Sequence, residues 1–276
     1  MRIDVNGTGI EVDDQGAADG NGEAVLLIHG WPDTHALWDH QVAALRAAGY
    51  RTIAPDVRGF GASDKPEGVE HYAIPFLFTD LVGVLDHLGV ERVHVVGHDW
   101  GAAIAWVFGI LAPDRVRSLT ALSVGHPAAF SRAGMAQREK SWYMLLFQFV
   151  DIAEQWLMQD GWRNFRDWSH HPAADEVAAR LANPADLTAT LNLYRANVPP
   201  EALLGAPFDA PPITVPVMGV WSDRDFALNE PQMVDSAQYV SGPWRYETIA
   251  GVDHWMMLEA SERVSALLLD FLASAS

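Results

Sequence analysis

The sequence Gly97-His98-Asp99-Trp100-Gly101 predicts the most about the fold of this chain. It follows a mostly apolar run at 93–96 and precedes a wholly apolar stretch at 102–108. This order predicts a buried strand, a sharp turn and a buried helix, the setting of a nucleophile elbow with the pattern Gly-x-nucleophile-x-Gly. The small residues allow a tight turn that pushes the central side chain outward, and here that side chain is a carboxylate.

Two interpretations of Asp99 follow from the motif alone. A carboxylate at an elbow can attack a saturated carbon and form an ester, whose carbonyl carbon is then attacked by water. Alternatively, Asp99 only accepts hydrogen bonds from nearby backbone amides, as aspartate often does in turns. The motif alone does not decide between these two roles of Asp99, so the other motifs of the chain have to be considered.

The composition indicates one globular core with an insertion, or two small domains that share a core. The 276 residues are 49% hydrophobic and 20% charged, with 36 acidic against 18 basic side chains and a formal net charge of −18. Because there is no basic cluster, we expect neither nucleic acid nor an anionic membrane as a partner. The absence of cysteine removes disulfides, thiolate metal ligands and cysteine nucleophiles.

The first residues lack a basic and then apolar signal segment. No apolar run approaches the ~20 residues that span a bilayer. We therefore expect a cytoplasmic protein.

Strand and helix patterns alternate in the first part of the chain. Apolar runs predict strands at 24–28, 51–54, 92–96 and 119–122. Apolar residues at helical spacing predict an amphipathic helix over 78–88. Nearly continuous apolar strands separated by helices imply an α/β fold, with a mostly parallel sheet covered by helices on both faces.

The pattern changes in the middle of the chain. Helical patterns rich in Trp, Phe and Leu occupy 142–149, 152–158 and 187–194, and strands return at 213–221 and 245–249, before a helix at 264–272. We therefore predict an α/β core of residues 1–128 and 209–276, with a helical cap at 129–208 inserted between them. Such a cap can close over the carboxyl ends of the strands, where open α/β sheets bind ligands.

The loops after the last two predicted strands carry further candidate residues. His254 follows the final strand, and Asp223 and Asp225 follow the strand before it. Taken alone, His254 is as readily a surface histidine, and either aspartate can form a turn. The order of nucleophile, acid and histidine on three separate loops matches the catalytic order of α/β-hydrolases, in which the acid orients the histidine.

At this point nearly the whole chain resembles the α/β-hydrolase superfamily and, within it, the soluble epoxide hydrolases. The resemblance rests on the elbow and on His-Gly-Trp-Pro at 29–32, Asp-Val-Arg-Gly-Phe-Gly-Ala-Ser at 56–63 and Gly-Val-Asp-His-Trp at 251–255. In that family the acid directly precedes an aromatic and then aliphatic residues. The resemblance therefore selects Asp225, which stands before Phe-Ala-Leu, over Asp223.

The resemblance also implies roles for the candidate residues. Asp99 would be the nucleophile, and His254 would activate water with the support of Asp225. The backbone N–H groups of Trp31 and Trp100 would form the oxyanion hole, with their side chains lining the substrate pocket.

Two tyrosines in the predicted cap resemble those that bond the epoxide oxygen in this family. Tyr143 lies in Trp-Tyr-Met-Leu-Leu-Phe-Gln at 142–148, and Tyr194 lies in Asn-Leu-Tyr-Arg at 192–195. The alternative is that each tyrosine packs by its ring as an ordinary cap residue. The implied substrates are a small apolar epoxide and water, the implied product is a vicinal diol, and no metal or organic cofactor is required.

Two other functions remain open from the sequence. A haloalkane dehalogenase uses the same elbow aspartate but needs two side-chain N–H donors for halide; Trp100 offers one, while Trp31 stands where many dehalogenases have Asn. A non-catalytic binding protein can keep the fold and a pocket, but has no need for an intact triad. Neither the pair His170-His171 nor the pair Asp253-His254 makes a metal site, since the spacing supplies no third ligand to either pair.

Overall fold

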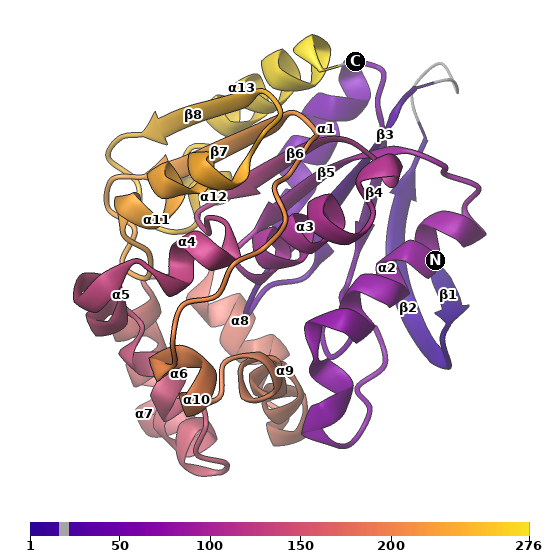
Figure 1. Cartoon of the computed structure of the whole chain (residues 1–276). Helices are drawn as coiled ribbons and strands as arrows, with labels where there is room; N and C mark the ends of the chain where they lie inside the picture. The colour runs from indigo at the N-terminus through magenta and orange to yellow at the C-terminus, as the bar shows by residue number, and fades with distance from the viewer. Residues whose placement is uncertain (17–21, 276) are drawn as a thin grey trace.

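The computed structural model describes residues 1–16 and 22–275 (Figure 1). In this part of the chain an 8-stranded sheet has the order β1-β2-β4-β3-β5-β6-β7-β8. Strands β1, β2 and β4 pair antiparallel at one edge, and every pair from β4 to β8 is parallel. The strands are β1 (Arg2–Val5), β2 (Thr8–Gln15), β3 (Ala24–Ile28), β4 (Arg51–Pro55), β5 (Val93–His98), β6 (Val116–Leu122), β7 (Val217–Ser222) and β8 (Trp244–Ile249).

Helices cover both faces of the sheet (Figure 1). All of β3 is buried, and its neighbouring residues Leu26 and Leu27 belong to opposite apolar layers. A strand covered on both sides therefore carries an uninterrupted apolar run. One layer contains α2 (Ile74–His87) and α3 (Trp100–Leu111); the other contains α1 (Asp39–Ala47), α12 (Met256–Glu259) and α13 (Ser261–Ser274).

The chain between β6 and β7 forms a group of helices beside the core, drawn from magenta to orange in Figure 1. The helix α7 contains a kink, since the backbone at 159–162 leaves the helical conformation. These inserted helices are α4 (Pro127–Ser131), α5 (Gly134–Lys140), α6 (Trp142–Leu146), α7 (Ile152–Ser169), α8 (Ala174–Arg180), α9 (Pro184–Asn197) and α10 (Pro200–Leu204). The division of the chain into core and cap at 129 and 208 stays a prediction.

Most differences from the predicted elements are shifts of their ends. The strand predicted at 213–221 begins later, at Val217, because Pro216 lacks the N–H that a sheet ladder needs. Ile213 forms only an isolated bridge to Val240. The edge strands β1 and β2 and the short helix α11 (Glu230–Val234) were not predicted, and the half-exposed end of β2 does not show the apolar run of a central strand.

Glycines make the sharp turn around Asp99 possible. A Cβ atom on Gly97 would lie 2.1 Å from the carbonyl oxygen of Gly101, and one on Gly101 would lie 1.9 Å from the carbonyl oxygen of Ile28. Asp99 itself has φ 53° and ψ −122°, a conformation that residues with a side chain rarely adopt. The contact between β3 and the start of α3 thus requires glycine and holds Asp99 in a strained backbone conformation.

Replacing Gly101 with alanine should destabilise the fold, since the new methyl group meets backbone atoms that cannot rotate away. We expect Gly101→Ala to lower the free energy of unfolding by roughly 1–3 kcal/mol, measured by urea denaturation. Gly16→Ala is the matched control, because Gly16 has no atom within 4 Å of an added Cβ. Equal stability of the two variants would contradict the packing described for the turn.

Candidate active site

The carboxyl group of Asp99 is buried beside two backbone amides. The N–H of Trp31 donates to its Oδ1 at 2.9 Å, and the N–H of Trp100 also bonds to it. Burial raises the pKa of Asp99 to about 6, although His254 and the two amides favour the charged form. Asp99 is therefore ionised at neutral pH while little water can reach it, which suits a nucleophile.

His29 fixes the loop that brings the Trp31 amide to Asp99. Its Nε2 accepts a backbone N–H from the loop after β4 at 3.0 Å, and its Nδ1 lies 2.9 Å from the carbonyl oxygen of Gly30. Burial lowers the pKa of His29, so the ring is neutral and donates from Nδ1. A Cβ on Gly30 would lie 2.4 Å from Oδ1 of Asp99, so glycine is needed for this approach.

His254 lies between two carboxylates. Its Nδ1 is 3.0 Å from Oδ2 of Asp225, and its Nε2 is 3.8 Å from Oδ2 of Asp99. Burial lowers the pKa of His254, but Asp225, through its charge and its hydrogen bond, and then the charge of Asp99 raise it to about 9. Burial also disfavours the charge on Asp225 and by itself raises its pKa. The charge and hydrogen bond of His254 outweigh this effect, so the pKa of Asp225 is lowered.

The two aspartates after β7 lie in different environments. Asp225 is buried, and its Oδ1 accepts the N–H groups of Ala227 and Leu228, each at 2.9 Å. Asp223 is exposed and accepts the N–H of Gly251 at 2.7 Å. Asp225 thus faces the imidazole, while Asp223 closes a turn at the surface.

Ser123 was not among the residues predicted from sequence. Its hydroxyl donates to Oδ2 of Asp225 and lies 2.9 Å from Nδ1 of His254. It follows β6 directly and has a φ of 73°, and Gln232 donates to its carbonyl oxygen at 2.9 Å. No motif surrounds Ser123, so its place beside β5 and β7 was visible only once the strand order was known.

Tyr143 on α6 and Tyr194 on α9 come together near Asp99. Their ring centroids are 6.0 Å apart, and both side chains are buried. Burial and then the charge of Asp99 raise the pKa of each phenol well above its ordinary value. The two side chains hydrogen-bond to each other, and the Trp100 side chain bonds to Tyr194. Both hydroxyl groups therefore stay protonated and can donate.

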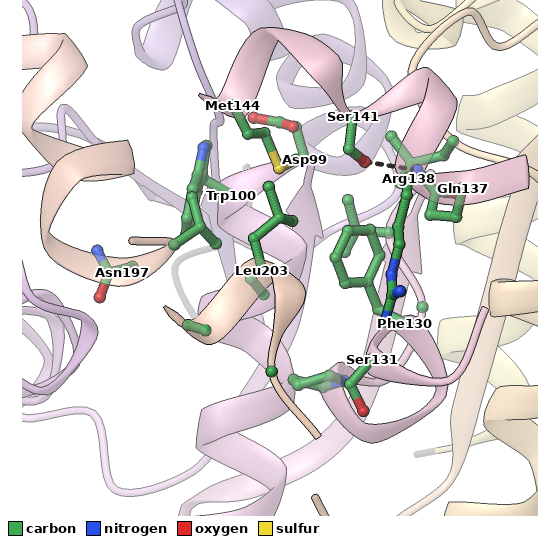
Figure 2. Close-up of a pocket in the computed structure, with 18 of the residues that line it drawn as sticks. Asp99, Trp100, Phe130, Ser131, Gln137, Arg138, Ser141, Met144, Asn197 and Leu203 are labelled. Atoms are coloured by element: carbon green, nitrogen blue, oxygen red, sulfur yellow. Dashed lines mark hydrogen bonds between the residues drawn. The ribbon is translucent and has the colours of Figure 1, made fainter. Parts of the chain in front are cut away.

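A cavity of about 260 Å³ opens beside Asp99 and Trp100 (Figure 2). Four side chains were predicted to line a substrate pocket. One of them, Trp100, belongs to the wall of this cavity. Trp31 donates its Nε1–H to Thr190 at 3.1 Å and packs against aromatic rings of the inserted helices, as do both tyrosines. The lining is otherwise mostly apolar, with polar side chains from Ser131, Gln137, Arg138, Ser141 and Asn197.

Two consecutive histidines tie the inserted helices to the loops of the site. His171 lies 3.1 Å from Oδ1 of Asp33, whose Oδ2 accepts the indole N–H of Trp255 at 2.9 Å. Burial opposes the charge of Asp33, but contacts led by His171 lower its pKa to about 2. His170 lies 3.0 Å from Asp253, the residue before His254.

Residues 23–261 match the family model described as the alpha/beta hydrolase fold. The chain is 35% identical to Epoxide hydrolase A of Mycobacterium tuberculosis over 98% of this chain and 96% of that protein. It is 32% identical to an epoxide hydrolase of Caballeronia sordidicola over 98% and 92% of the two chains. This chain belongs to the epoxide hydrolase family of α/β-hydrolases. The family and fold class predicted from the sequence are thereby confirmed.

The structures of other epoxide hydrolases agree with this assignment. The Bacillus megaterium epoxide hydrolase, solved in complex with an inhibitor, has a TM-score of 0.86 and 28% sequence identity, and the match covers 99% of this chain and 100% of that one. Within residues 1–16 and 22–275, no helix of this family member is both long and apolar enough to cross a membrane. In the same residues, no three His, Asp or Glu side chains are grouped to hold a metal ion.

Removing the charge of Asp99 should lower the pKa of His254. The negative carboxylate stabilises the imidazolium, so Asp99→Asn should move the titration of His254 downward from about 9. NMR titration of the imidazole measures this shift. Asp223→Asn is the control, because the exposed Asp223 does not contribute to the His254 shift. An unchanged midpoint in Asp99→Asn would show that the two groups are not coupled.

Proposed function

We propose that this protein opens an epoxide to a vicinal diol through an ester on Asp99. The observation that carries the proposal is the convergence of a buried carboxylate, an Asp225–His254 pair and two protonated tyrosines. The curated relatives named epoxide hydrolases, which match along nearly the whole chain, support the same reaction.

In the first step the carboxylate of Asp99 attacks a ring carbon from the side opposite the C–O bond. That bond breaks, and its electron pair becomes an alkoxide on the former ring oxygen. Tyr143 and Tyr194 donate hydrogen bonds to this oxygen as its negative charge develops; one phenol passes its proton to the alkoxide and regains a proton from solvent. Because burial holds both phenols protonated, the donors are in place before the reaction begins.

The ester itself prepares the second step. Esterification removes the negative charge of Asp99, one of the charges that raise the pKa of His254. The imidazole then loses its proton more readily and can act as a general base toward water. The hydrogen bond from Nδ1 to Asp225 leaves Nε2 directed at Asp99, so the activated water is beside the ester.

Water then attacks the carbonyl carbon of the ester. The carbonyl oxygen becomes an oxyanion, which the amides of Trp31 and Trp100 stabilise, since both already donate to the Asp99 carboxylate. One such donor typically contributes ~3 kcal/mol to lowering the barrier. Collapse of the intermediate breaks the ester C–O bond, and the leaving oxygen takes the proton that His254 removed from water, so the diol is released and the carboxylate is restored. No step requires a metal or an organic cofactor.

The indole N–H groups argue against haloalkane dehalogenation. That reaction needs two free side-chain donors for halide, whereas the Trp31 indole donates to Thr190 and the Trp100 indole bonds to Tyr194. Absence of halide release from haloalkanes, tested beside epoxide turnover, separates the two functions. Diol formation from any epoxide also excludes a protein that only binds ligands.

The function is tested most directly by trapping the ester. In His254→Gln, Asp99 should still be alkylated, but the ester should persist because no base activates water. Intact mass spectrometry should show a gain equal to the mass of the epoxide, located at Asp99 by peptide mapping. Asp223→Asn should turn over without trapping. A folded His254→Gln protein that gains no mass would contradict the proposed division of roles.

The tyrosines should contribute to the alkylation step. Tyr143→Phe and Tyr194→Phe each remove a hydroxyl group while keeping the ring that packs in the inserted helices. A hydrogen bond to a developing charge is worth roughly 1.5–3 kcal/mol, so each change should slow single-turnover alkylation about tenfold to a hundredfold. The double variant should be nearly inactive and still folded. Alkylation at the wild-type rate in the double variant would remove the tyrosines from the mechanism.

A further inference from the structure

Arg138 lines the active-site cavity without a partner for its charge. It belongs to α5 and is partly buried. Figure 2 shows its side chain running along the wall, with the guanidinium directed toward Phe130 and Ser131. In the part of the chain that the structure describes, no hydrogen-bond acceptor or acidic side chain engages this guanidinium.

The two neighbouring cations are engaged. Arg132 pairs with Asp209 at 2.7 Å, and Lys140 donates to the carbonyl oxygen of Asp225. The chain has 36 acidic residues for 18 basic ones, so acidic partners are plentiful. A guanidinium that gives up some hydration in a pocket wall without gaining a partner is poised to bind an anionic ligand.

Two side chains of opposite charge, Asp99 and Arg138, line the cavity. Asp99 is ionised at neutral pH, since its pKa is about 6. Met144 and Leu203 also line the cavity, and Figure 2 shows Met144 next to Asp99. An anionic group is repelled by Asp99 and attracted by Arg138. A ligand with one anionic terminus can therefore bind in only one direction.

We propose that the substrate is an epoxide that carries a carboxylate, and that Arg138 binds this carboxylate. The inference rests on the proposed function and deepens it. A planar guanidinium matches a carboxylate with two parallel hydrogen bonds. The mostly apolar lining of the cavity fits a hydrocarbon spacer, and the volume of about 260 Å³ favours a compact acid. The bound carboxylate places the epoxide at Asp99.

The test compares ω-epoxy carboxylic acids with their primary amides, which match them in size but are uncharged. Over a series of spacer lengths, the wild-type protein should favour the acid by about tenfold in kcat/KM at the best length, mainly through KM. The preference should fall as salt is added, because the guanidinium is partly exposed. Equal kcat/KM for acid and amide at every length would overturn the proposal.

Variants of Arg138 test whether its side chain causes the preference for the acid over the amide. In Arg138→Gln the ratio of kcat/KM for acid over amide should fall to about one, whereas Arg138→Lys should retain part of it. Arg132→Gln is the matched control: it removes a neighbouring cation that is already paired with Asp209, so the ratio should stay as in the wild type. An acid preference that survives in Arg138→Gln would place the anion site elsewhere and overturn the assignment.

A binding measurement separates this inference from the reaction itself. Calorimetry with hexanoate and hexanamide, which cannot react, should show about tenfold tighter binding of the acid to the wild type and no difference in Arg138→Gln. If no epoxide is turned over but this difference appears, the proposed function fails while the anion site stands. If epoxides are turned over but acid and amide bind equally, the anion site fails alone.

Discussion

The contact of β3 with the first turn of α3 is the constraint on which the site depends. Gly101 lets the two backbones meet, and that meeting sets the strained conformation of Asp99 and its distance from the Trp31 amide. The conformational cost, of order 1–3 kcal/mol for such a residue, has to be offset by the surrounding core. The buried strands on both sides of β5 supply that support.

The buried charges of the site determine each other's protonation. His254 lies 3.0 Å from Asp225 and 3.8 Å from Asp99. The charges of both carboxylates raise the pKa of His254, and the charge of His254 lowers the pKa of each carboxyl. Loss of the negative charge of Asp99 would therefore lower the pKa of His254 even if no atom moved. In the proposed mechanism, the formation of the ester removes that charge, so the first step prepares His254 for the second.

Features encoded by neighbouring residues in the chain could be predicted from the sequence, whereas features that depend on contacts between distant segments could not. The elbow, the apolar strands and the order of Asp99, Asp225 and His254 are local patterns, so they could be recognised without coordinates. Ser123 could not, because its role depends on which strands are neighbours in the sheet. The exposed edge strands carry too little apolar pattern, and Arg138 stands out only once the partners of the other cations are known.

His170 and His171 connect the inserted helices to two loops of the candidate site. His170 is bonded to Asp253, beside His254, and His171 to Asp33, in the loop that carries the Trp31 amide. Because the two histidines are adjacent at the end of α7, the two contacts relate the position of that end to both loops at once. The packing of the inserted helices and the geometry of the two loops are therefore not independent of each other.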